Sequence, residues 1–418
     1  MIKLAFGHEF YNLEIEEKNF RGFLKTKPSR VDADNKELVE QALSHPVGGA
    51  RLQELAEVKK ARSAAVIVND ITRPTPYYAL LPPLLEELRR AGLKNEDIKL
   101  VVALGIHRPH SEKENREIFG EEIVSRYEVL NHNCDADLKT IGVLSNGWPL
   151  EINRTAAEAD LLIATGVVEL HYFAGYSGGR KSILPGIASR KLIEANHQMM
   201  DDPKARTGNY KDNPVNDIML EAAGKAGMDF ILNVVMLSKD QIGLAVAGDF
   251  RQAWKKAVAF CEEQNVITIE EPADIVIASA GGYPKDISMY QAQKSLDAAL
   301  AAVKKNGTVV LLAECGEGLG EAAFMRWIDE AVSPEDIKRR FYQHFELGGH
   351  KAFAICKALE HCQVILVSKL GKALTEKMFM EAETDLQAAY EKALRRQGEL
   401  ASVYIMPEAP KLGIKIKD

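Results

Sequence analysis

Side chains able to bind anions and move protons follow three apolar runs of the chain. They are Asp70, Thr72 and Arg73 after residues 64–68, His107 after residues 98–104, and His171 after residues 159–164. If these runs are parallel strands, their carboxyl ends form the edge where open α/β sheets bind ligands. Guanidinium groups bind carboxylates and phosphates, and imidazoles exchange protons near neutral pH. We therefore expect these side chains to converge on one site.

A glycine-rich segment, GYSGGRKS (175–182), invites comparison with a phosphate-binding P-loop. That motif needs glycine where Arg180 stands, and it follows a strand, whereas this segment follows His171 and Tyr172. A kinase is therefore disfavoured. The backbone N–H groups of the glycines could still bind a phosphate by the same physics.

The chain has ten histidines and no HExxH or HxH zinc motif. His107, His171 and His197 stand in settings that favour function: a strand end, the entrance of the glycine loop, and a helix after Pro185-Gly186. An ordinary surface or core position is expected for His8, His45, His110, His132, His344 and His361.

In the second half, GGYPKD (281–286) follows the apolar run ADIVIASA, and YQAQK (290–294) comes next. Gln291 and Lys294 are three residues apart and share a face of the expected helix. A solvated helix face is the ordinary explanation. Anion binding becomes attractive if this strand end faces the first domain.

Positioning these residues requires parallel sheets. Helix-length stretches separate short, continuous apolar runs at 64–68, 98–104, 159–164, 273–278, 308–312 and 363–367, a pattern typical of strands covered on both faces. Amphipathic stretches at 78–91 and 386–397 predict helices. Pro82 and Pro83 indicate that the first helix starts at these prolines, which then stand in its first turn. The predicted fold class is α/β, with two domains of mostly parallel sheets and the active site in an interdomain cleft.

A domain boundary is expected where a helical stretch ends near residues 265–272. The first domain then spans 1–268 and holds the candidate acid/base residues. The second spans 269–401. The strand at about 402–418 either ends the second domain or returns to the first.

Composition excludes several classes of protein. The 418 residues carry a net charge of −7, whereas nucleic-acid binders need a basic surface. The N-terminus lacks the pattern of a signal peptide, and no apolar run approaches the roughly 18 residues of a membrane span. Five scattered cysteines suit a reducing compartment. We expect a cytoplasmic protein that binds neither nucleic acid nor membranes; its oligomeric state is left open.

Five segments together resemble the nickel-pincer-nucleotide lactate racemases and their homologues. In family order they are NDITRPTP (69–76), GIHRPH (105–110), ELHYFAGYSGGRKSILPG (169–186), EANH (194–197) and GGYPKDISMYQAQKSL (281–296). The resemblance covers nearly the whole chain. It implies a racemase or epimerase of 2-hydroxy acids.

The resemblance also implies a cofactor: nickel pyridinium-3-thioamide-5-thiocarboxylic acid mononucleotide, built by other proteins that would be partners of this chain. Lys181 would attach it covalently through a thioamide, and His197 would bind the nickel ion. Further cofactor contacts are implied for Asp70, Thr72, Ser177, Gly178 and Gly179. His107 and His171 would be the paired acid/base residues, and the substrate would be held by Arg73, Tyr290, Gln291 and Lys294.

Such chemistry suits the substrate, because the Cα–H of a 2-hydroxy carboxylate is a very weak acid. Removing a hydride gives a transient 2-keto acid, and returning it to the other face inverts the centre. The cofactor supplies that acceptor and the protein supplies placement and proton transfer.

At one place the sequence differs from the lactate-acting members of the family in a way that concerns the substrate. Lactate-acting members carry a tryptophan in the second domain, whereas residues 345–357 (FELGGHKAFAICK) have none and the nearest is Trp327. A substrate other than lactate, larger or more polar, is one consequence. His350 and Lys351 either contact it or begin a surface helix.

Two alternatives stay open. A zinc hydrolase would gather His107, His171 and His197 around one ion, with Asp70 as the base and Lys181 unmodified. A carrier that stores or delivers the cofactor would need neither paired histidines nor Arg73.

Overall fold

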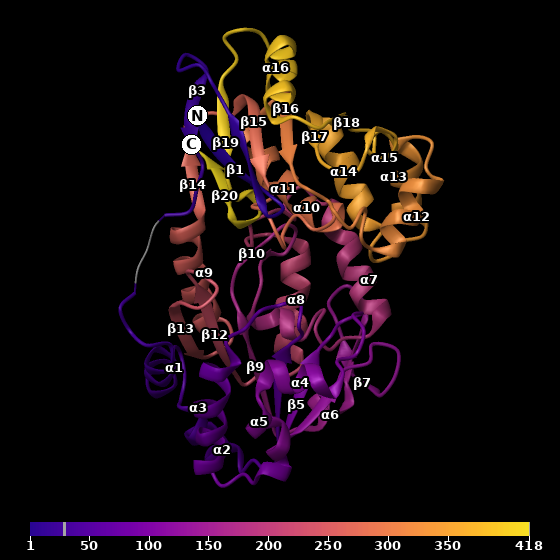
Figure 1. Cartoon of the computed structure of the whole chain (residues 1–418). Coiled ribbons are helices and arrows are strands. Elements are labelled where there is room, and N and C mark those ends of the chain that lie inside the picture. Colours follow the sequence, from indigo (N-terminus) through magenta and orange to yellow (C-terminus); the bar gives the residue numbers. More distant parts are fainter. Residues whose placement is uncertain (28–30, 418) are drawn as a thin grey trace. The chain divides into compact units, whose positions relative to one another are not determined.

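The computed structural model describes residues 1–27 and 31–417, which divide into two compact units (Figure 1). Unit 1 joins Met1–Lys27 with Asn265–Asp418, and unit 2 is Pro28–Gln264. Each unit is built around a largely parallel sheet with helices packed on it. The predicted α/β class is confirmed.

In its described part, unit 2 contains a six-stranded sheet in the order β13-β12-β9-β4-β5-β6. The strands are β4 (Ala64–Asn69), β5 (Ile98–Ala103), β6 (Glu128–Asn131), β9 (Leu161–Val167), β12 (Phe230–Met236) and β13 (Ile242–Gly248). Neighbours pair in parallel except for β13, which is antiparallel to β12. The apolar runs that predicted β4, β5 and β9 are therefore strands, and their carboxyl ends lie at one edge.

One face of this sheet packs against α1 (Asn35–Ser44), α2 (Leu52–Lys59) and α3 (Tyr77–Arg90) in a continuous apolar core. Helix α3 begins before Pro82 and Pro83, so the prediction that it starts at them is wrong. Its first turn forms because Tyr77, Ala79 and Leu80 bury their side chains in the core. That burial outweighs the backbone hydrogen bonds that two prolines remove.

Unit 2 is completed by further helices and strands. They are α4 (Glu112–Phe119), α5 (Glu121–Arg126), β7 (Leu138–Val143), β8 (Pro149–Asn153), α6 (Arg154–Glu158), β10 (Leu170–His171), β11 (Gly175–Tyr176), the 3₁₀ turn η2 (Gly179–Ser182), α7 (Arg190–Gln198), α8 (Pro214–Lys225) and α9 (Gln252–Asn265). The short hairpin β10–β11 leads directly into η2. The motif that resembled a P-loop (175–182) is therefore the second strand of a hairpin followed by a 3₁₀ turn.

Unit 1 contains, among its described residues, a six-stranded sheet that is parallel throughout, in the order β18-β17-β16-β15-β19-β3. The strands are β3 (Phe20–Phe23), β15 (Ala273–Ser279), β16 (Val303–Leu312), β17 (Gln363–Val367), β18 (Glu381–Glu383) and β19 (Val403–Met406). Its helices are α10 (Met289–Ala292), α11 (Lys294–Ala302), α12 (Ala322–Glu330), α13 (Pro334–Gln343), α14 (His350–His361), α15 (Lys372–Lys377) and α16 (Leu386–Gln397). Two further pairs are β1 (Ile2–Phe6) with β2 (Glu9–Leu13), and β14 (Val266–Ile269) with β20 (Gly413–Ile416).

The division of the chain differs from the predicted domains at both ends. Residues 1–27, expected in the first domain, belong to unit 1 because β3 pairs with β19 and because Leu4 and Phe6 enter its core. Strand β19 also pairs with β15, so the late strand ends this unit and does not return to unit 2. Figure 1 shows the indigo N-terminal strands beside the yellow C-terminal ones.

The helices and the cysteines of the described residues bear on membrane spanning and on disulfide formation. None of the helices there is both long and apolar enough to cross a membrane. The five cysteines are all buried, and none forms a disulfide.

Candidate functional site

The loops after β4 and β5 bring an acid and an imidazole together. These strands are parallel neighbours, with Asn69 opposite Ala103, so the loops that follow them meet. Nδ1–H of His107 donates to Oδ2 of Asp70 at 2.5 Å, and the Thr72 hydroxyl donates to Oδ1 at 2.7 Å. The Asp70 side chain is 4% exposed and that of His107 is 49% exposed. Asp70 thus holds one ring nitrogen of an accessible imidazole, a common way to orient a general base.

Electrostatics keep this carboxylate ionised. Burial would raise the pKa of Asp70, but the hydrogen bonds from His107 and Thr72 and the charge of Arg73 together lower it. An ionised Asp70 favours the tautomer of His107 with its proton on Nδ1. The other ring nitrogen, Nε2, is then the one with a lone pair.

Two residues without a predicted role fix this loop. The Ile71 N–H donates to Nε2 of His110 at 3.0 Å, and His110 is held through Nδ1 by Asn115 at 3.1 Å. The hydroxyl of buried Tyr77 accepts from the Asn69 N–H. His110 is buried as a sequence reader would expect of a core histidine, but its contact with the loop depends on tertiary folding.

Arg180 is the centre of the glycine loop. Its fully buried guanidinium donates to the carbonyls of Ala174 (3.0 Å), Tyr176 (2.7 Å), Ser177 (3.1 Å) and Gly178 (3.1 Å), and to Oδ1 of Asn216 (2.8 Å). It also lies over the Trp254 ring, with Cζ 4.0 Å from the centroid. The residue that departs from the P-loop motif is therefore what shapes this loop.

The backbone of the loop requires glycine at several positions. Gly175 has φ +78°, and a Cβ there would lie 2.3 Å from the carbonyl oxygen of Asn209. Gly178 has φ +73°, and a Cβ there would meet Val168 at 2.6 Å. The positive φ angles and the close approach of neighbouring atoms explain why these two positions are glycine, without a bound ligand.

Ser177 and Gly179 are occupied by contacts within unit 2. The Ser177 hydroxyl donates to the Val167 carbonyl at 2.8 Å and accepts from the Glu169 N–H at 2.9 Å. The Gly179 N–H donates to Oδ1 of Asn233 at 2.8 Å. The predicted cofactor contacts of Ser177, Gly178 and Gly179 stay predictions.

Beyond the loop, an aromatic ring links the predicted attachment and metal-binding residues. Lys181 Nζ lies 5.6 Å from the centroid of Phe173, and the His197 ring lies 4.9 Å from the same ring. The His171 ring also packs on Phe173, at 4.6 Å, and its Nδ1 accepts from the Ala174 N–H at 3.2 Å. The structure thus gathers His171, Lys181 and His197 around Phe173.

This environment disfavours positive charge on all three groups. Burial, followed by the charges of Arg73 and Arg180, holds the pKa of Lys181 well below its ordinary value. Burial, followed by the charge of Lys181, lowers the pKa of His197 to about 3. Burial also lowers that of His171, with Lys181 the next cause. At neutral pH the two imidazoles are therefore neutral, the form that acts as ligand or base, and the site disfavours the ammonium form of Lys181.

Arg73 connects this group with the Asp70–His107 pair. Its backbone N–H donates to the Asp70 carbonyl at 3.0 Å, and its guanidinium lies 3.5 Å from a carboxylate oxygen of Glu169. Its charge is among the causes that lower the pKa of both His171 and Lys181. Unit 2 therefore brings seven predicted residues into one neighbourhood: Asp70, Thr72, Arg73, His107, His171, Lys181 and His197.

The remaining predicted residues lie in unit 1. Tyr290 and Gln291 are in α10, and Lys294 begins α11. Lys294 Nζ donates to Oε1 of Gln291 at 2.9 Å, as their three-residue spacing indicates. The ammonium and the amide thus form one polar group that suits a carboxylate.

Trp327, the tryptophan nearest to residues 345–357, belongs to the core of unit 1. It is 1% exposed, its Nε1–H donates to Glu346 at 2.9 Å, and its ring lies where a Cβ on Gly349 would be. His350 is also buried, and its Nδ1 accepts from the Gly348 N–H at 3.0 Å. Of the two alternatives for this segment, a surface helix start is therefore wrong for His350 and Lys351, which are 4% and 2% exposed.

Comparison with known proteins bears on this assembly of residues. Residues 6–208 match the model of the lactate racemase N-terminal domain, and residues 268–412 match that of the lactate racemase C-terminal domain. The lactate racemase of Lactiplantibacillus plantarum is 36% identical, over 100% of this chain and 99% of that protein. The chain belongs to the lactate racemase family.

Other relatives agree with this assignment. The lactate racemase of Thermoanaerobacterium thermosaccharolyticum is 40% identical over 81% of this chain and 80% of that protein. The structure of the lactate racemase apoprotein from the same organism superposes with a TM-score of 0.92, at 35% identity and 99% coverage of both chains. A Thermotoga maritima protein of 20% identity shares the fold, with a TM-score of 0.64 over 91% of this chain and 98% of that one. As a family member, this protein is an isomerase of the racemase type.

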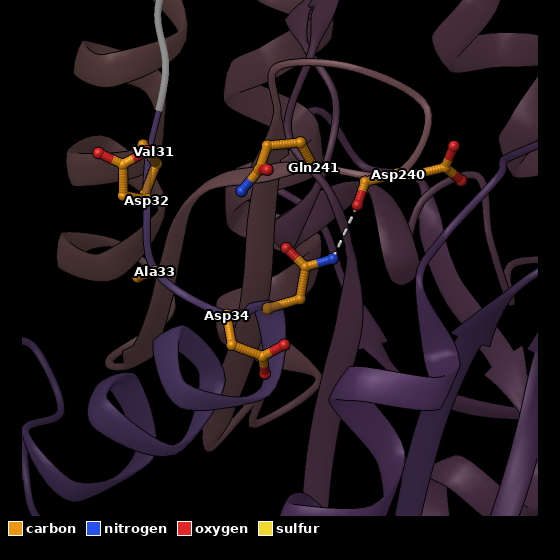
Figure 2. A pocket seen from close by; sticks show the side chains of 7 residues that line it. Val31, Asp32, Ala33, Asp34, Asp240 and Gln241 are labelled. Atoms are coloured by element: carbon orange, nitrogen blue, oxygen red, sulfur yellow. Dashed lines mark hydrogen bonds between the residues drawn. The ribbon is translucent and has the colours of Figure 1, made fainter.

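A metal-binding cluster and a surface pocket are two other kinds of candidate site. Throughout the described residues, no three side chains of histidine, cysteine, aspartate or glutamate come together as a metal-binding group. The zinc hydrolase alternative therefore lacks its expected set of three imidazoles there. A surface pocket of about 430 Å³ in unit 2, drawn in Figure 2, is lined by acidic, amide and small side chains from residues 31–35 and 240–241. Its lining contains no imidazole, guanidinium or ammonium group.

Proposed function

We propose that this protein racemises a 2-hydroxy carboxylic acid through the nickel-pincer nucleotide, attached at Lys181. The single observation that carries the proposal is the grouping of Lys181, His171 and His197 around Phe173. Lactate is the first substrate to test, because the characterised relatives carry that name. The substrate class extends to larger or more polar 2-hydroxy acids, including those with a second stereocentre.

The residues present fit that group. Thioamide formation needs a primary amine in its neutral form, which the surroundings of Lys181 favour. Metal binding needs a neutral imidazole, and the low pKa of His197 supplies one at neutral pH. We infer that Lys181 would hold the nucleotide and His197 the nickel ion. When bound, the group supplies a reversible acceptor for the hydride of the substrate Cα–H.

The chain's own residues then handle protons and position. One enantiomer presents its hydroxyl to His107, whose orientation Asp70 fixes, and the other presents it to His171. Each imidazole removes the hydroxyl proton as the carbonyl forms, with the ring nitrogen that holds its lone pair: Nε2 of His107 and Nδ1 of His171. For this step Nδ1 of His171 exchanges the Ala174 N–H for the substrate hydroxyl, and each imidazole returns the proton in the reverse direction. In unit 2, Arg73 is the group that would bind the substrate carboxylate. In unit 1, the Lys294–Gln291 pair and the neighbouring Tyr290 form a second group that suits a carboxylate. Two bases are needed because both enantiomers present the Cα–H to the same acceptor. With the carboxylate also fixed, inversion exchanges the positions of the hydroxyl and the substrate side chain.

The test is to express the chain with the cofactor-synthesis proteins, which the proposal makes its partners, and to measure intact mass and nickel content. We expect a mass increase that maps to Lys181, with nickel near one equivalent, and interconversion of L- and D-lactate or another 2-hydroxy acid on chiral chromatography. Lys181→Arg should abolish the modification, and Lys191→Arg, at an exposed lysine of α7, should not. If a relative is loaded in parallel while this chain stays unmodified, the proposal is wrong. A loaded chain that converts no 2-hydroxy acid would instead point to a cofactor carrier.

A further inference from the structure

Lys351 is a buried lysine in the first turn of α14, with 2% of its surface exposed. Burying an ammonium group costs free energy unless it is paired, and the N-terminal end of a helix adds an unfavourable dipole. Such a placement needs compensation from neighbouring groups. In this protein those groups come from the α10–α11 segment.

The compensation runs through a buried chain of side chains. Lys351 Nζ donates to Oε1 of Gln293 at 2.7 Å, and Gln293 is fully buried. Nε2 of Gln293 in turn donates to Oδ2 of Asp297 at 3.3 Å. Burial raises the pKa of the Asp297 carboxyl, and the charge of Lys351 opposes this shift. The Lys351 ammonium of α14 is thus linked to α11 through the Gln293 amide and the Asp297 carboxylate.

Gln293 stands at the junction of the two short helices, as the residue after α10 and before α11. The proposed substrate residues Tyr290, Gln291 and Lys294 all lie within three residues of it. A change in the backbone at Gln293 would therefore alter the angle between α10 and α11. It would move Gln291 and Lys294 relative to each other.

Lys351 also contacts Tyr290 directly. Its Nζ lies 5.5 Å from the centroid of the Tyr290 ring, within the range of a cation–π interaction. The Phe324 ring also lies near Tyr290, with the two ring centroids 6.1 Å apart. Gly320 approaches closely, since a Cβ there would lie 3.3 Å from that of Tyr290. Several groups therefore hold Tyr290 in place, and one of them is the Lys351 ammonium.

We propose that Lys351 is a positioning residue for substrate binding, which fixes the α10–α11 junction through Gln293 and sets the ring of Tyr290. The inference rests on the proposed function of Tyr290, Gln291 and Lys294 in holding a 2-hydroxy carboxylate. It adds that α14 determines how tightly the carboxylate is bound. The buried ammonium also adds positive potential near the α10–α11 junction, which favours anionic substrates.

The test compares Lys351→Met, which keeps the length and removes the charge, with Lys357→Met as a matched control. Lys357 is on the same helix and lies 5.8 Å from the Phe353 ring, so it also makes a cation–π contact. Because carboxylate binding would weaken in ground and transition states alike, we expect Lys351→Met to raise KM about tenfold or more and to change kcat by less than about threefold. Modification of Lys181, measured by mass, should stay at the wild-type level. An unchanged KM, or a fall in kcat alone, would overturn the inference.

Lys351→Arg keeps the cation, and we expect its KM to stay within about threefold of wild type. A second readout does not depend on activity: hydrogen exchange of the apoprotein in peptides covering 289–302. Loss of the Gln293 link should speed exchange there in Lys351→Met and not in Lys357→Met. Unchanged exchange would overturn the inference even if the wild-type protein racemises nothing. A wild-type protein without racemase activity would refute only the proposed function.

Discussion

Nδ1 of His107 lies 2.5 Å from Oδ2 of Asp70, although 37 residues separate them in the chain. The contact forms because β4 and β5 are parallel neighbours whose following loops meet at one edge of the sheet. It joins a buried carboxylate to an exposed imidazole. The pair therefore has a fixed half and an accessible half, which is what proton transfer to a substrate requires.

Asp70→Asn should lower kcat/KM about 100-fold or more, because an amide does not enforce the tautomer with the proton on Nδ1. The chiral assay measures this loss, and intact mass should show normal modification of Lys181. Asp160→Asn is the matched control, since Asp160 also accepts several hydrogen bonds in unit 2 but lies just before β9. An Asp70→Asn enzyme as active as the Asp160→Asn enzyme would contradict the role given to the pair.

Lys181 should react with a small amine-selective reagent at a lower pH than exposed lysines do. Burial and the charges of Arg73 and Arg180 lower its pKa, so its neutral form is present where ordinary lysines are protonated. Peptide mapping across a pH series measures the labelling, with the exposed Lys191 as the internal reference. Arg73→Gln removes one cation and should raise the pKa of Lys181, which shifts its labelling to higher pH. A shift to lower pH, or none, would contradict this assignment.

The strands that carry the site were predictable because their signal is local. Runs such as 64–68 and 98–104 are apolar without interruption, and only strands buried on both faces need that pattern. Once the strands are parallel, their carboxyl ends must share an edge, and the meeting of Asp70 with His107 follows. The roles of His171 and His197 come from the resemblance to the family.

Other features were not predictable because they depend on pairs far apart in the chain. Nothing near residues 20–23 indicates that β3 pairs with β19, some 380 residues later. In the sequence, Arg180 is only a departure from a nucleotide-binding motif. Its role could not be predicted, because its five acceptors come together only in the folded loop and at Asn216. Lys351 gives no sign in the sequence that it is buried, because its partners Gln293 and Tyr290 lie about 60 residues away.

Arg180→Lys should destabilise unit 2 by about 3 kcal/mol, because lysine keeps the buried charge but cannot reach all five acceptors. Arg190→Lys is the control, since Arg190 makes a two-bond ion pair with Asp135 at the surface and should cost less than about 1 kcal/mol. Urea unfolding at neutral pH measures both. Equal losses would show that the acceptors of Arg180 do not need a guanidinium.

His132 should make the protein acid-sensitive. Burial lowers its pKa to about 4, from an ordinary value near 6.5, and its Nε2–H donates to the Ala188 carbonyl at 3.0 Å. Between those two values the unfolded chain binds a proton that the folded protein does not. Stability therefore falls as pH drops from about 6.5 to about 4, by up to about 3 kcal/mol for this residue alone.

Urea unfolding at a series of pH values measures this dependence. His132→Phe should be less stable at neutral pH, through the lost hydrogen bond, but should lose less stability between pH 6.5 and 4 than the wild type does. Part of the slope should remain, because the pKa of His197 is lowered to about 3 and it titrates in the same direction. His45→Phe, at an exposed histidine, should leave the slope unchanged. A His132→Phe protein with the full wild-type slope would show that His132 is not the residue whose protonation unfolds the protein in acid.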